Sequence, residues 1–176
     1  MDSGDFLMNL GWALPEKAFQ WIEENIPFGS NIVELGSGHG SSRLSQNYQL
    51  WSIEHDEEWL NVSMGTYIHA EIIPFSKNGI EGHWYDAEKI KKALPTSYAL
   101  LIIDGPPSTI GRNGVLAFQE IFNWDCYILV DDTHRPQDRI IADELSTQKS
   151  LNQIHFTEYF EQTDTNREFI ILSPNR

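Results

Sequence analysis

The sequence predicts a three-layer α/β sandwich, built on a doubly wound, seven-stranded and mostly parallel sheet with the last strand antiparallel. Short apolar segments alternate with helix-like segments five times, which is typical of a parallel sheet covered on both faces. Residues 98–103 form a nearly continuous apolar run, as expected for a strand buried on both faces. The final two strand-like segments are joined by a connection too short for a crossover, so we expect them to pair antiparallel.

Local patterns predict each element in turn. Pro15 suits the first turn of a helix whose apolar residues recur at helical spacing, and Pro27 ends that helix. Asp56 and Asp86 are expected to cap two further helices with their side chains, and Ser41 or Ser42 a third. The expected helices span residues 15–26, 41–48, 57–67, 87–94, 113–122 and 136–148. The expected strands span residues 31–35, 50–53, 70–74, 98–103, 127–130, 152–159 and 168–172, with a loop over 76–82.

Composition indicates one globular domain over residues 1–176, in which residues 1–13 are a candidate lid. The net charge of −14 disfavours nucleic acid and anionic membranes as partners. Cys126 is the single cysteine, so neither an internal disulfide nor a cysteine metal site is expected. Nothing resembles a signal peptide or a membrane span, so the expected compartment is the cytoplasm. The expected partner is a small-molecule substrate, and a homodimer is left open.

One stretch organises the chain. The strand at residues 31–35 is followed by Gly36, Gly38 and Gly40, then by a helix, and then by a second strand that ends at Glu54. This order is the layout of a nucleoside-binding βαβ unit. Glycines let a ligand approach the backbone, and the start of the helix offers free N–H groups. A carboxylate at the tip of the second strand can accept hydrogen bonds from both hydroxyls of a ribose.

Acidic residues end the two central strands further along. Asp104 follows the fourth strand, and Asp131 and Asp132 follow the fifth. Neighbouring strands lie about 5 Å apart, so these carboxylates should meet and raise one another's pKa. A divalent cation with oxygen ligands (Mg²⁺, Mn²⁺ or Ca²⁺) would relieve the repulsion. The alternative is that Asp131 or Asp132 caps the next helix.

Residues 34–40 read Glu-x-Gly-x-Gly-x-Gly, which resembles the signature of the class I S-adenosylmethionine-dependent methyltransferases. The order of elements from about residue 14 to residue 176 is also similar to that of this superfamily. The resemblance implies a Rossmann-like methyltransferase fold, S-adenosylmethionine as the cofactor and methyl transfer as the activity.

The same resemblance implies which residues hold the cofactor. The glycine loop and Glu34 would hold the methionine part, and Glu54 would hold the ribose. The segment after the third strand would border the adenine. The cofactor residues so implied are Glu34, Gly36, Ser37, Gly38, Gly40, Ser41, Glu54, His55, Trp84, Tyr85, Asp86 and Asp104.

The acidic strand ends resemble those of metal-dependent, catechol-type O-methyltransferases. That likeness implies that Asp104, Asp131 and Asp132 bind Mg²⁺ or Mn²⁺, which would lower the pKa of a substrate hydroxyl. Those enzymes carry a basic lysine shortly after the first aspartate, whereas this chain has Pro106–Pro107–Ser108 there. His134 is the candidate substitute base, and with Asp104 it completes the expected catalytic residues. Its alternative is a solvent-exposed histidine at a helix start.

The run from Asp104 through Gly111–Arg112 to Asp131–Asp132 also resembles sugar-modifying O-methyltransferases of the same superfamily. Arg112 would orient an anionic or polyhydroxyl substrate, or form a surface ion pair.

The expected function is methylation of an oxygen on a small polar, sugar-like molecule, assisted by a divalent metal. Three alternatives stay open. They are metal-independent N- or O-methylation with His134 as the base, a non-catalytic S-adenosylmethionine sensor or subunit, and an NAD-binding Rossmann protein. The last would need a small residue in the place of Ser41 and normally a second domain.

Overall fold

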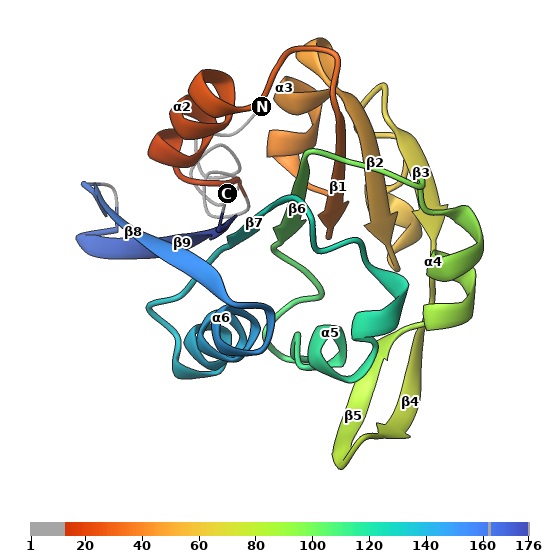
Figure 1. Cartoon of the computed structure of the whole chain (residues 1–176). Helices are drawn as coiled ribbons and strands as arrows, with labels where there is room; N and C mark the ends of the chain where they lie inside the picture. The colour runs from red at the N-terminus through yellow and green to blue at the C-terminus, as the bar shows by residue number, and fades with distance from the viewer. Residues whose placement is uncertain (1–12, 162, 176) are drawn as a thin grey trace.

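The computed structural model describes residues 13–161 and 163–175 (Figure 1). Its main sheet has seven strands in the order β3-β2-β1-β6-β7-β9-β8. All neighbouring pairs are parallel except those made by β9, which runs antiparallel to both β7 and β8, so the predicted sheet is confirmed. The strands are β1 Asn31–Leu35, β2 Gln49–Glu54, β3 Thr66–His69, β6 Leu100–Ile103, β7 Tyr127–Val130, β8 Leu151–Phe160 and β9 Thr165–Pro174.

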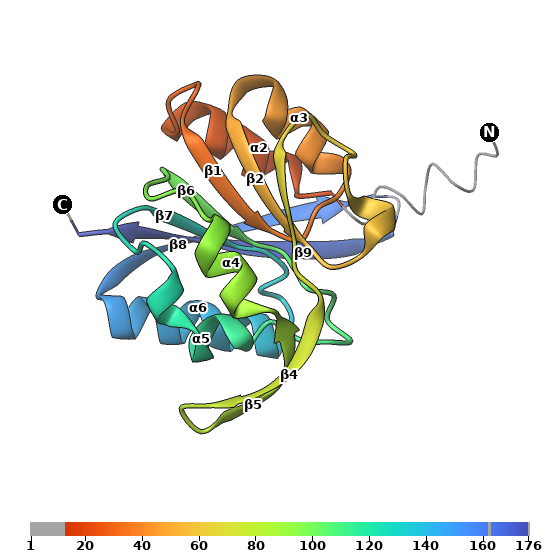
Figure 2. The same ribbon diagram turned by 90° about the vertical axis from the view of Figure 1, so that its right-hand side faces the viewer.

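Helices cover both faces of the sheet (Figure 2). One face carries α2 and α3, whose buried residues include Phe19 and Leu44, and the other carries α4, α5 and α6, which bury Ile90 and Leu145. Strand β6 is buried along its whole length because both faces are covered, which explains its unbroken apolar sequence. The helices are α2 Glu16–Asn25, α3 His39–Asn47, α4 Ala87–Ala93, α5 Gly114–Ala117 and α6 Pro136–Lys149.

Helix α2 takes its cap from the far end of the chain. Its N-cap residue is Pro15, which makes no side-chain capping bond. The carboxylate of Glu158 on β8 instead accepts hydrogen bonds from the backbone N–H groups of Glu16 (3.2 Å) and Lys17 (2.7 Å). This carboxylate satisfies two of the unpaired donors at the helix start and complements its dipole.

The helix predicted over residues 57–67 is wrong. A single 3-10 turn, η2 (Glu57–Trp59), is followed by turns and then by β3. Asn61 adopts a left-handed conformation with φ 67°, which an α-helix does not accommodate. Gly65 then lies so close to the Leu50 carbonyl that an added Cβ would be 2.9 Å from it, and this close approach brings β3 beside β2.

Residues 72–74 of the strand predicted at 70–74 do form a strand, but it is not the third strand of the main sheet, and the loop predicted over 76–82 is wrong. The third sheet strand ends at His69, and the following residues form a separate antiparallel hairpin of β4 (Ile72–Lys77) and β5 (Ile80–Tyr85). Asn78 and Gly79, both with positive φ, make its two-residue turn. Asn-Gly is the preferred pair for such a turn, so the sequence carried a signal for this hairpin. The hairpin extends away from the main sheet (Figure 1).

Two smaller differences concern the start of one helix and the length of another. Helix α3 begins at His39, so Ser41 is not its cap but lies within its first turn. The helix predicted over 113–122 is divided into α5 and a 3-10 turn, η3 (Gln119–Ile121). Asp86, in contrast, caps α4 as predicted, by accepting bonds from the N–H groups of Glu88 and Lys89.

No helix in the described ranges combines the length and the apolar character needed to span a bilayer. The candidate lid falls largely outside the described residues.

Candidate functional site

The glycine loop after β1 is held by a buried carboxylate. Oε1 of Glu34 accepts hydrogen bonds from the hydroxyls of Ser41 and Ser52, both at 2.6 Å. The hydroxyl of Ser41 also accepts a bond from the N–H of Gly38 at 3.0 Å. Burial raises the pKa of Glu34 to about 7, although the two serine hydrogen bonds oppose the shift. The first acidic residue of the motif therefore ties the loop to both β1 and β2.

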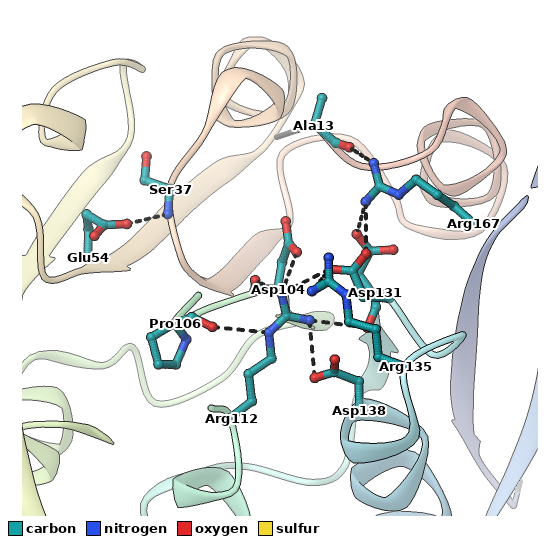
Figure 3. Close-up of polar contacts among 11 residues, drawn as sticks. Ala13, Ser37, Glu54, Asp104, Pro106, Arg112, Asp131, Arg135, Asp138 and Arg167 are labelled. Atoms are coloured by element: carbon teal, nitrogen blue, oxygen red, sulfur yellow. Dashed lines mark hydrogen bonds and ion pairs between the residues drawn. The ribbon is translucent and has the colours of Figure 1, made fainter. Parts of the chain in front are cut away.

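A second carboxylate ties the loop to the tip of β2. Oε2 of Glu54 accepts a hydrogen bond from the N–H of Ser37 at 2.8 Å (Figure 3). Oε1 accepts bonds from the N–H groups of His55 (2.7 Å) and Asp56 (2.8 Å). Glu54 therefore fixes the positions of two backbone segments that face each other across the end of the sheet.

The loop meets β6 at the point where the strand order reverses. Gly36 has φ +88°, and an added Cβ would lie 3.0 Å from the Cα of Gly105. A Cβ on Gly105 would lie 2.6 Å from the Cα of Gly36 and 2.6 Å from the Tyr85 hydroxyl. The ends of β1 and β6 can approach this closely because both positions are glycine; a side chain at either one would collide with the other backbone. Ligands of doubly wound sheets bind at this switch point.

A cavity of about 340 Å³ opens there. This volume is within the range of small-molecule sites. Seven of the predicted site residues line it, namely Gly36, Ser37, Glu54, His55, Tyr85, Asp104 and Asp132. An adjoining hollow of about 10 Å³ is lined by Glu34, Gly38, Gly40 and Ser41, and it shares Gly36 and Asp104 with the larger cavity.

The hydroxyl of Tyr85 is an unsatisfied polar group in the wall of this cavity. It is fully buried and has no hydrogen-bond partner within residues 13–161 and 163–175. Burial raises its pKa well above the ordinary value, and the negative charge of Glu54 adds to that shift. A buried hydroxyl without a partner costs free energy, so a ligand with a polar atom at this position would be stabilised.

Four predicted site residues lie outside the cavity walls. Trp84 is buried, stacks on Phe118 and sits against Gly114, where it anchors the hairpin to α5. Asp86 is occupied as the cap of α4. His134 is exposed, and Asp131 is fully buried behind the cavity wall.

The three aspartates at the strand ends meet as predicted. Asp104, Asp131 and Asp132 each offer an oxygen atom, and these atoms lie within 4.8 Å of one another. Burial raises the pKa of Asp104 well above its ordinary value, and the negative charge of Asp131 raises it further. Burial likewise raises the pKa of Asp131 to about 6, against the opposing charge of Arg167.

Sequence reasoning missed that arginines pair with these carboxylates. Nη2 of Arg112 lies 3.2 Å from Asp104 Oδ1, and Nη1 lies 3.5 Å from Asp138 Oδ1 (Figure 3). Nη2 also lies 3.2 Å from Asp132 Oδ2. Of the two roles left open for Arg112, the ion pair does form, but it is buried and not on the surface, because only 4% of the Arg112 side chain is exposed. A buried cation is tolerated here because several acceptors surround it.

Two further arginines complete the pairing. Nη2 of Arg167 lies 2.6 Å from Asp131 Oδ2 and 3.5 Å from Asp132 Oδ1, while its Nη1 donates to the carbonyl of Ala13 at 2.8 Å. Nη1 of Arg135 lies 2.9 Å from Asp132 Oδ2. The arginines come from three separate segments, and all of them line the cavity. The other lining residues that went unpredicted are Asp56, Trp59, Gly105, Pro107 and Ser108.

Comparison with known proteins shows the fold. No protein-family model and no curated protein matches the chain. Similar solved structures include an O-methyltransferase from Bacillus cereus in complex with SAH (10% identity, TM-score 0.63, covering 92% of this chain and 82% of that one). Others are the O-methyltransferase TomG from Streptomyces achromogenes in complex with SAM (10%, 0.56, 93% and 82%) and an rRNA methylase from Streptococcus thermophilus (10%, 0.57, 91% and 95%). The chain therefore has the Rossmann-like fold of class I methyltransferases.

Proposed function

We propose that this protein is an S-adenosylmethionine-dependent methyltransferase that methylates an oxygen atom of a small polar molecule. The observation that carries the proposal is the switch-point cavity, where the glycine loop held by Glu34 and Glu54 faces the unpartnered hydroxyl of Tyr85. The two O-methyltransferases of this fold named above were solved in complex with SAH and SAM. The closely approaching glycines leave room for a ligand against the backbone.

The residues present fit a nucleoside cofactor. Glu54 is buried, lines the cavity and uses Oε2 for one hydrogen bond, so that oxygen keeps one lone pair for a ribose hydroxyl. Tyr85 offers a hydroxyl that can donate or accept. When bound, the cofactor would supply an activated methyl group, which an acceptor oxygen attacks as the carbon–sulfur bond breaks.

Asp104 is the proposed general base. Its carboxylate lines the cavity and is 28% exposed, so an acceptor hydroxyl can reach it. It would take the proton that the acceptor oxygen loses during methyl transfer. A carboxylate whose pKa is raised is a stronger base than an ordinary one. His134 lies outside the cavity walls, and so the assignment of His134 as the base is not carried forward.

A divalent metal is not part of this proposal. The three carboxylates converge, but each of them already forms at least one ion pair with Arg112, Arg135 or Arg167. A small polar acceptor is supported by the charged residues around the cavity, and the net charge of −14 argues against a nucleic acid.

Isothermal titration calorimetry tests the proposed binding of the cofactor. S-adenosylhomocysteine should bind the wild-type protein, and Glu54→Gln should weaken binding about 10- to 100-fold, the cost of a hydrogen bond to a charged group. Glu58→Gln, an exposed glutamate on the neighbouring turn, is the matched control and should bind normally. Absence of binding at millimolar S-adenosylmethionine and S-adenosylhomocysteine, or binding of NADH instead, would overturn the proposal.

The role of Asp104 as the general base is tested by measuring methyl transfer to a panel of small molecules that carry hydroxyl groups. Asp104→Asn should keep its affinity for S-adenosylhomocysteine and lose methyl transfer. An Asp104→Asn protein that methylates at the wild-type rate would remove Asp104 from the chemistry.

A further inference from the structure

The carboxylates at the ends of β6 and β7 sit in a nearly balanced set of charges. Four carboxylates face three guanidinium groups, which leaves one negative charge in excess. The set consists of Asp104, Asp131, Asp132, Asp138, Arg112, Arg135 and Arg167. Without the arginines, so many buried carboxylates would either stay protonated or need a cation of another kind.

Arg112 is the central cation of this set. Arg135 keeps 36% of its side chain exposed and Arg167 keeps 13%, whereas Arg112 keeps 4%. Besides its three carboxylate partners, the guanidinium donates through Nε to the Pro106 carbonyl (3.3 Å), through Nη1 to the Asp131 carbonyl (3.3 Å) and through Nη2 to the Asp104 carbonyl. Every nitrogen of the group is therefore engaged with oxygen.

The local backbone delivers Arg112 to this position. The N–H groups of Ile110 and Gly111 both bond to the carbonyl of Pro107, and Gly111 adopts φ +93°. This left-handed residue turns the chain back toward the strand ends just before α5 begins. The loop that begins with Asp104 after β6 thus folds back, so that Arg112 near its end contacts Asp104.

Arg112 and a metal ion would compete for the same oxygen atoms. Nη2 lies between Asp104 and Asp132, at 3.2 Å from an oxygen of each. A magnesium-sized ion binds carboxylate oxygens at about 2.0–2.1 Å, so an ion bridging these two atoms would face the guanidinium at close range. An ion bridging these oxygen atoms would lie against Nη2, and water would screen its repulsion from Arg112 only weakly, because 4% of that side chain is exposed.

We propose that the guanidinium of Arg112 takes the place of a divalent metal at this site and that the wild-type protein holds no metal there. Arg112 is then a positioning residue, which keeps Asp104 directed toward the cavity. The proposal deepens the proposed function, because it makes methyl transfer independent of a metal. Its metal-binding test does not require that the protein be a methyltransferase.

Titration with Mn²⁺, followed by the electron paramagnetic resonance signal of the free ion, tests the proposal. The wild-type protein should bind no Mn²⁺ at millimolar concentration. Arg112→Met vacates the space and should bind one Mn²⁺, and Asp104→Asn in the same protein should abolish that binding. Arg43→Met is the matched control: it removes a half-exposed arginine from Glu16 and Glu23 and should create no site.

The result that overturns the proposal is binding of Mn²⁺ by the wild-type protein that Asp104→Asn removes, and this holds even if Arg112→Met fails to fold. A folded Arg112→Met protein that binds no Mn²⁺ would also overturn it. Thermal unfolding gives a second readout, since Mn²⁺ should raise the Tm of Arg112→Met alone. Where turnover is measured, EDTA should leave the wild-type rate unchanged. Failure to bind S-adenosylmethionine would refute the proposed function without affecting the Mn²⁺ result.

Discussion

Glu34 is the residue at which burial acts most directly on the motif. Glu34 is 5% exposed, and its carboxyl group accepts two serine hydrogen bonds, yet its pKa rises from 4.5 to about 7. Desolvation thus outweighs the hydrogen bonds. The folded protein holds a proton on Glu34 at pH values where the unfolded chain has already released it.

This pKa shift predicts how stability varies with pH. Between pH 4.5 and about 7 the unfolding free energy should fall as the pH rises, because the native state binds more protons. The contribution of Glu34 to this fall is about 3 kcal/mol. Glu34→Gln cannot titrate, so the difference in stability between it and the wild type should change by that amount across the window. Urea unfolding at a series of pH values measures it.

The exposed Glu81→Gln is the control for that series and should give a difference that does not vary with pH. A wild-type profile that Glu34→Gln follows in parallel would contradict the assignment of the raised pKa to Glu34.

Three residues of the cavity wall, Gly36, Ser37 and Glu54, could be placed together from the sequence because their information is local. They fall within one βαβ unit, where spacing along the chain fixes position in space. The arginines could not be predicted in the same way. Arg112, Arg135 and Arg167 come from three segments, and only the folded sheet brings them to the same carboxylates.

At the scale of elements, the contact between the ends of β1 and β6 depends on Gly105. Gly105→Ala would place a Cβ 2.6 Å from the Gly36 Cα and 2.6 Å from the Tyr85 hydroxyl, so backbone would have to move. We expect a loss of about 1–3 kcal/mol of stability. We also expect loss of S-adenosylhomocysteine binding, because the glycine loop would be displaced. Chemical denaturation and calorimetry measure the two effects.

Gly79→Ala, at the tip of the hairpin between β4 and β5, is the control that shows the cost of a positive φ without a steric collision. It has positive φ but nothing within 4 Å of an added Cβ, so it should cost about 1–2 kcal/mol and leave binding intact. Equal binding by wild type and Gly105→Ala would show that the close approach does not matter for the site.

Elements with a strong periodic or apolar pattern could be predicted, as β6 and α6 illustrate. The region between β2 and α4 could not be predicted from helical spacing alone. Asn61 and Gly65 interrupt what reads as a helix, and the Asn78–Gly79 turn makes a hairpin of what reads as a loop. In that region turn chemistry outweighed the spacing of apolar residues.

At the scale of the whole molecule, the fold leaves the substrate undecided, because a similar fold occurs in an rRNA methylase and in O-methyltransferases. Charge separates these alternatives. A net charge of −14 opposes the approach of phosphate groups. Fluorescence anisotropy with a labelled ribosomal RNA fragment at physiological salt should therefore detect no saturable binding. Tight binding that weakens steeply with added salt would refute this expectation.

The cap that Glu158 provides to α2 has a consequence for the order in which the molecule can be completed. The two partners are separated by 142 residues. A ribosome adds residues at about 5–20 per second, so the start of α2 is synthesised on the order of ten seconds before its cap exists. Throughout that interval the start of α2 lacks the carboxylate that later accepts hydrogen bonds from its N–H groups. The first helix of the described residues is thus capped only after β8, near the end of the chain, has been made.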